Sequence, residues 1–175
     1  MESLHDVMLE WHEFFVLLGT AAGTLVGLLF VAATVSSGVF SLERRAPLRM
    51  FLTATVVHFS SVLAVSLIML VPLANWRLLG GIVMICALVG LGYFVLTVRD
   101  SIRDGLITNV DWEDRTWYGM LPFLAYVAEL ATGVMLAGGA AVGCAGLAAC
   151  MGLLLVVGIH NAWDITVWTI SRRPG

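Results

Sequence analysis

Four side chains that can carry a charge lie inside long apolar stretches of this sequence. They are His58, Glu129, His160 and Asp164, and the amide of Asn161 stands directly beside His160. Ionisable residues in such stretches are energetically costly and commonly functional. His160 and Asp164 are four residues apart, so a helix would place both on one face, where the carboxylate could orient the imidazole.

These residue types suit four kinds of chemistry. The groups could hydrogen-bond to one another as a structural lock that fixes helix register, or form a proton or ion pathway, because histidine titrates near neutral pH. His58, His160 and a carboxylate could bind a transition metal, although their spacing matches no metal motif. The two histidines could also ligate one haem. Our prediction is that the protein has no resident cofactor.

The apolar runs that must position these residues are long enough to cross a bilayer. Of 175 residues, 60% are hydrophobic and 12% are charged, whereas a soluble domain carries roughly 25% charged residues. These values exclude a soluble enzyme, a disordered tail and a nucleic-acid-binding domain. The runs are continuous rather than alternating, which predicts helices. We predict one all-α domain, a bundle of five transmembrane helices at about 14–40, 51–73, 78–98, 118–138 and 146–170.

The break between the last two helices has to be placed without help from charge or proline. Residues 122–170 are too many for one crossing and suit two. Glycine is the residue that most readily ends a helix and turns the chain. The sequence therefore predicts a tight turn near Gly138, Gly139 and Gly143.

The arginines predict how the helices are oriented. With the N-terminus outside, eight of the nine arginines fall in inside loops or at an inside C-terminus, and only Arg77 lies outside. This asymmetry is the positive-inside rule. In that topology His58, Glu129 and His160 lie roughly 12 to 16 Å from the inner surface, at a rise of about 1.5 Å per residue. We expect three helices to share one polar cluster there.

The first apolar run carries a stripe of glycines, Gly19, Gly23 and Gly27. A spacing of four puts all three on one face, where another helix can approach closely. The partner could be a second copy of the chain or another helix of the same chain. In either case a bulky residue at Gly23 is expected to disrupt assembly.

Several other chemistries have no motif in this sequence. Cys86, Cys144 and Cys150 are odd in number and lie in apolar runs, so they are predicted to be packing residues rather than disulfides or metal ligands. The sequence contains no GxSxG, HExxH or phosphate-loop pattern. We predict that the protein is not an enzyme.

Two segments carry a family resemblance. The stretches EFFVLLGTAAGTLVGLLFVAAT (13–34) and GIHNAWDITVW (158–168) resemble a family of uncharacterised small polytopic bacterial inner-membrane proteins, sometimes labelled modulators of a membrane AAA protease. The resemblance implies a multi-pass protein of the bacterial inner membrane and supplies no activity. The matching positions are Phe14, Phe15, Gly19, Gly27, Leu28, Leu29, Phe30, Val31, Asn161, Ala162, Trp163 and Asp164.

Two functional hypotheses follow. The first is a small homo-oligomeric ion or proton channel or transport protein, in which the buried histidines and carboxylates form the path. The alternative is a non-catalytic accessory or scaffold subunit of a larger membrane complex, which would dock through the 99–117 loop. The expected partners are the lipid bilayer, further copies of the chain and another membrane protein, and not a nucleic acid.

Overall fold

The computed structural model describes residues 3–36, 45–73, 75–103 and 112–171, and within these ranges the chain is helical apart from short turns, with no strand. Five of the helices are long and apolar enough to cross a membrane, which confirms the predicted fold class. The long helices are α1 (Leu4–Ser36), α2 (Arg45–Leu70), α3 (Trp76–Arg103), α5 (Leu121–Ala137) and α6 (Val142–Ser171). The short α4 (Trp112–Arg115) and a π-helical turn, η2 (Thr116–Met120), lead into α5.

The helices extend beyond the apolar runs that predicted them. α1 begins at Leu4 rather than at 14, and α3 continues to Arg103 rather than stopping near 98. Hydropathy marks where a helix meets apolar surroundings, whereas backbone hydrogen bonding continues into polar flanks as long as no residue breaks it. The predicted end of the first helix, at 40, lies outside the described residues.

The turn between α5 and α6 lies where the glycines predicted it. Gly138 follows the last residue of α5, and Gly139 has a φ of 81°, in the left-handed region that glycine adopts without a Cβ clash. The Gly139 N–H donates to the Leu136 carbonyl at 2.8 Å, which closes the turn. Gly143, predicted to lie in the break, is already inside α6.

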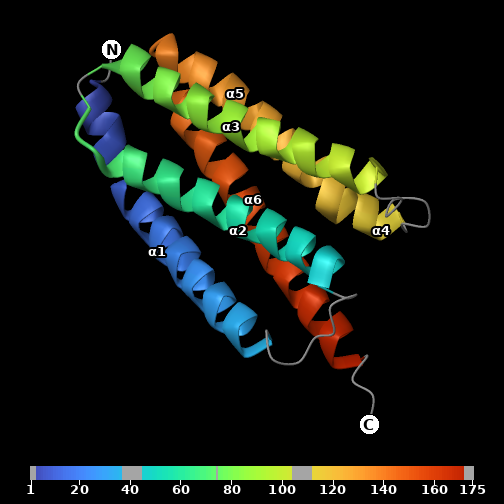
Figure 1. The fold of residues 1–175 in the computed structure, drawn as a ribbon. Helices are drawn as coiled ribbons and strands as arrows, with labels where there is room; N and C mark the ends of the chain where they lie inside the picture. Colours follow the sequence, from blue (N-terminus) through green and yellow to red (C-terminus); the bar gives the residue numbers. More distant parts are fainter. Residues whose placement is uncertain (1–2, 37–44, 74, 104–111, 172–175) are drawn as a thin grey trace.

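The bundle is organised around α6. α1 packs against α2, and α3 packs against α5, while α6 contacts both α2 and α5. Figure 1 shows α6, in orange to red, passing between these two pairs, with the chain ends at opposite ends of the bundle. An odd number of crossings requires that placement of the ends. Which end is cytoplasmic stays a prediction.

The outward faces of the long helices carry many exposed apolar side chains. Leu17 is 70% exposed and Val89 is 68% exposed. A soluble protein rarely exposes so much contiguous apolar surface, whereas a membrane-spanning helix meets lipid tails there. The chain is therefore an integral membrane protein with several crossings.

Glycines let the helices approach to backbone contact. A Cβ added at Gly80 on α3 would collide with the main chain of Gly133 and Ala137 on α5. One added at Gly158 on α6 would collide with the Phe59 ring on α2. Close approach of this kind matters in lipid, where packing contacts rather than water exclusion hold helices together.

The contact between α3 and α5 predicts a difference between two neighbouring glycines. Gly80→Ala should lower the free energy of unfolding by about 1–3 kcal/mol, because the new methyl overpacks against backbone that cannot move aside. Gly81→Ala should be neutral or slightly stabilising, because nothing lies within 4 Å of its added Cβ. Unfolding of both variants by detergent titration measures the difference, and equal losses would contradict this packing.

Candidate functional site

Tyr126 connects three helices at the centre of the bundle. It is fully buried, and its ring lies against Gly90 of α3, where an added Cβ would collide with it. Its hydroxyl lies 2.9 Å from His58 Nδ1 and 3.3 Å from Ser61 Oγ, both on α2. One arrangement satisfies all three groups: Ser61 donates to the Tyr126 oxygen, and Tyr126 donates to the imidazole.

Glu129 lies one helical turn beyond Tyr126 on α5. It is fully buried, and neither carboxyl oxygen has a hydrogen-bond partner among the described residues. The Cys86 thiol of α3, the Cys150 thiol of α6 and the Tyr126 hydroxyl lie within electrostatic range of it. Among the described residues the carboxyl forms no salt bridge.

These surroundings determine the cost of ionising the Glu129 carboxyl. Transferring an unpaired carboxylate out of water costs many kcal/mol, so such a group is carried as the neutral acid unless a cation compensates it. A buried acid beside a tyrosine–histidine pair can hold a proton and exchange it when the surroundings change. We call His58, Ser61, Tyr126 and Glu129 the central polar group.

A second set of side chains joins η2 to the end of α6. The Trp117 ring stacks on the His160 ring with centroids 3.8 Å apart and planes 6° from parallel. The Tyr118 hydroxyl donates to Asp164 Oδ2 at 3.0 Å. Trp117, Tyr118, His160, Asn161 and Asp164 are called the terminal polar group below, because Asp164 is exposed at the end of the apolar part of α6.

Asn161 is the most deeply buried member of the terminal polar group. Its side chain is fully inaccessible, and neither of its amide atoms has a hydrogen-bond partner within the described ranges. The same holds for His160 Nδ1. The expected hydrogen bond between Asp164 and His160 is replaced by one between Asp164 and Tyr118.

The structure thus distributes the predicted site residues between two groups. His58 and Glu129 belong to the central polar group, while His160, Asn161 and Asp164 belong to the terminal polar group. Sequence reasoning missed the two tyrosines, Tyr118 and Tyr126, that bond to these residues. The available signal was a phenol placed inside an apolar run, where a buried hydroxyl needs a partner.

The metal and haem chemistries find little support in these surroundings. No group of three or more His, Cys, Asp or Glu in the part of the chain that the structure describes could hold a metal ion. His58 directs Nδ1 to Tyr126, and His160 is stacked on Trp117. The two histidines therefore have separate partners.

Beyond Glu129, toward the turn between α5 and α6, the described core is mostly apolar, and the buried polar side chains there are the hydroxyls of Ser66 on α2 and Thr132 on α5. Leu79 and Val83 come from α3, Leu136 from α5, and Cys144 and Leu147 from α6, and all five are fully buried. We call these residues the turn-side apolar layer. Polar side chains approach Glu129 from the opposite direction, through Tyr126 and His58. The buried imidazole, phenol and amide side chains, those of His58, Tyr126 and Asn161, thus lie on the side of Glu129 that faces the Asp164 end, whereas the turn side holds two buried hydroxyls.

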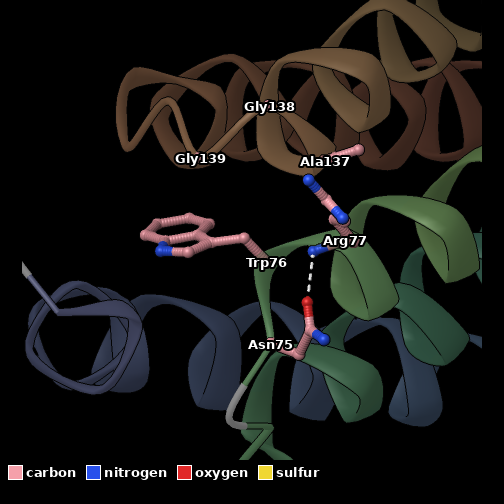
Figure 2. Close-up of a pocket in the computed structure, with 6 residues that line it drawn as sticks. All are labelled: Asn75, Trp76, Arg77, Ala137, Gly138 and Gly139. Atoms are coloured by element: carbon pink, nitrogen blue, oxygen red, sulfur yellow. Dashed lines mark hydrogen bonds between the residues drawn. The ribbon is translucent and has the colours of Figure 1, made fainter.

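The turn end of the bundle carries a shallow pocket of about 360 Å³. Figure 2 shows the Arg77 side chain pointing toward Ala137 at the end of α5, while the Arg77 N–H donates to Asn75 Oδ1 at 2.8 Å. The pocket is separated from Glu129 by the turn-side apolar layer. Its lining residues are Asn75, Trp76, Arg77, Ala137, Gly138 and Gly139.

The glycine stripe of α1 contacts α2 of the same chain over part of its length. A Cβ added at Gly19 would lie 3.0 Å from Ser66 Cβ, and one at Gly23 would lie 3.8 Å from Leu63 Cδ1. Gly27 has nothing within 4 Å of its added Cβ. The stripe therefore packs within the chain at Gly19 and is open at Gly27.

No protein family, curated protein or solved structure matches this chain. The family resemblance of the first and last helices stays a prediction.

The central polar group predicts a measurable role for one hydroxyl. Tyr126→Phe keeps the ring against Gly90 but leaves His58 Nδ1 without a partner, which should cost about 1–3 kcal/mol of unfolding free energy. His58→Phe combined with Tyr126→Phe should cost less than the sum of the single variants. Detergent unfolding of all three, with Tyr93→Phe as the control, measures this coupling, and simple additivity would count against the contact.

The glycine stripe predicts opposite behaviour at its two ends. Gly19→Val should destabilise the monomer, because the added atoms meet Ser66. Gly27→Val should leave monomer stability unchanged, and it should alter oligomeric mass only if a second copy packs on that open face. Mass measurement in nanodiscs together with detergent unfolding separates the two effects.

Proposed function

We propose that this integral membrane protein carries protons or small cations, with Glu129 as the central binding group. The observation that supports this most strongly is a fully buried carboxyl without a hydrogen-bond or cation partner among the described residues. Intramembrane ionisable groups usually mark an ion or proton pathway. A carboxyl needed only for packing would be replaced at less cost by an apolar side chain of similar volume.

The two polar groups suggest a route. Asp164 and Tyr118 lie at the exposed end, Asn161 and His160 lie deeper, and His58 and Tyr126 lie beside Glu129. Hydroxyl, imidazole and carboxyl groups at successive depths can pass a proton by small rearrangements.

Passage of a proton or ion across the whole bilayer requires the turn-side apolar layer to change its conformation. A layer of leucine, valine and cysteine side chains blocks an ion by excluding water from its path. We therefore expect a second arrangement of the bundle in which α3 or α6 shifts at this layer, or an assembly in which a neighbouring copy completes the path. Homo-oligomerisation through the open end of the glycine stripe belongs to this proposal, as does location in a bacterial inner membrane.

The turn-side apolar layer also favours a second candidate function. If the layer never opens, the polar groups are structural, and the protein is a non-catalytic accessory or scaffold subunit. That candidate predicts no ion flux by the purified protein.

Flux through reconstituted vesicles separates the two functions. Liposomes that contain the protein should dissipate a pH gradient faster than empty ones, and Glu129→Gln should reduce the rate to that of protein-free vesicles, because the amide cannot release a proton. Glu113→Gln, at an exposed position on α4, is the matched control and should retain the flux. Protein that is folded and silent in this assay would support the accessory role instead.

A further inference from the structure

The side chains around Glu129 indicate which cation it can accept. A bound metal or alkali ion needs several oxygen ligands in place of its hydration shell. The Thr132 hydroxyl donates to the Glu129 main-chain carbonyl at 2.7 Å, and the Tyr126 hydroxyl is engaged with α2. The nearby ionisable groups on α3 and α6 are thiols, which are poor ligands for hard cations. Within the described residues, Glu129 belongs to no group of three or more His, Cys, Asp or Glu side chains that could hold a metal ion.

A proton needs none of these ligands. One carboxyl oxygen suffices to bind it, and the neutral acid that results removes the cost of a buried charge. The arginines whose side chains the structure describes, at 77, 99, 103 and 115, are all exposed. No described arginine therefore compensates the ionised form.

We infer that Glu129 is a proton-binding site that excludes metal and alkali cations and that is loaded from the end of the bundle carrying Tyr118 and Asp164. This inference rests on the proposed function for the choice of Glu129 as the working group, and it names the species that this group binds. The direction of loading is argued from the kinds of polar side chain on each side of Glu129: an imidazole, a phenol and an amide are buried on the Asp164 side, and two hydroxyls, those of Ser66 and Thr132, on the turn side.

A hydrophobic carbodiimide tests the protonation of Glu129 without any transport assay. The reagent, dicyclohexylcarbodiimide, reacts with a protonated carboxyl in an apolar environment. The acid proton passes to one carbodiimide nitrogen, and the carboxylate oxygen attacks the central carbon. Transfer of the acyl group to a nitrogen then gives an N-acylurea that keeps every atom of the reagent. Peptide mass spectrometry of the protein in nanodiscs locates the adduct.

Four results support the inference together. Glu129 should gain one reagent mass, Glu129→Gln should remove that adduct while Glu113→Gln keeps it, and sodium or lithium salts should give no protection. Labelling should also fall as the pH rises, because the reactive form is the acid. Failure of Glu129 to react in folded protein, or protection by an alkali cation, would overturn the proton site. If Glu129 is labelled but the protein shows no proton flux, the proposed function is refuted and the proton-binding site is still supported.

The direction of loading has its own test. In a variant in which Cys86, Cys144 and Cys150 are replaced by alanine, single cysteines are introduced as Val157→Cys, on the Asp164 side of Glu129, or Leu147→Cys, on the turn side. Both positions are fully buried in α6. Both variants must retain carbodiimide labelling of Glu129, which shows that the bundle is intact. A charged, water-soluble thiol reagent applied to nanodiscs, where both faces are accessible, should modify the cysteine at 157 at least about tenfold faster than the cysteine at 147. Equal rates, or faster reaction at 147, would refute loading from the Asp164 end.

Discussion

The interior of a membrane bundle has no water to solvate a charge, and the Glu129 carboxyl lies in that interior without a salt-bridge partner among the described residues. This electrostatic constraint explains several features of its surroundings. The carboxyl is carried most cheaply as the acid, and its neighbours are side chains that tolerate a neutral group, two thiols and a phenol. Apolar side chains beyond it pack against a neutral acid at lower cost than against a carboxylate.

Tyr126 shows how the same bundle combines packing with polarity. Its ring occupies the space that Gly90 leaves open, and its hydroxyl reaches α2 at His58 and Ser61. One side chain thereby holds α5 at a fixed depth relative to both α3 and α2. A buried hydrogen bond across helices is directional, whereas apolar contacts are not, so it selects one register among several of similar packing.

The π-helical turn before α5 has a comparable effect at the other polar group. Such turns are rare and are often found at functional positions. Here the turn carries Trp117 and Tyr118, which contact His160 and Asp164 of α6. The residues in the last helix that resemble a family motif, Asn161 to Asp164, therefore lie at a joint between two helices. Their arrangement suits either a stable connection or an entry point for protons.

Much of the fold could be predicted from the amino-acid sequence alone. Continuous apolar runs predicted five crossings, and Gly138 and Gly139 predicted the turn between the last two, because helix length and left-handed φ angles depend on residues close together in sequence. The first boundary was misplaced by about ten residues, since hydropathy does not detect where backbone hydrogen bonding starts. The sequence also identified Glu129 and His58 as unusual, because an ionisable group in an apolar run is visible without coordinates.

Only the tertiary structure identified the hydrogen-bond partners of the buried ionisable residues. His58 and Tyr126 are 68 residues apart, and no periodicity within one helix indicates which side chain of another helix will face it. The same holds for Gly80 and Gly133, whose contact depends on the relative rotation and depth of α3 and α5. Local sequence determined that each run is a helix long enough to cross a bilayer, because hydropathy and helix propensity depend on neighbouring residues. The contacts between helices decided which polar groups meet, because they depend on the relative rotation and depth of segments far apart in the chain.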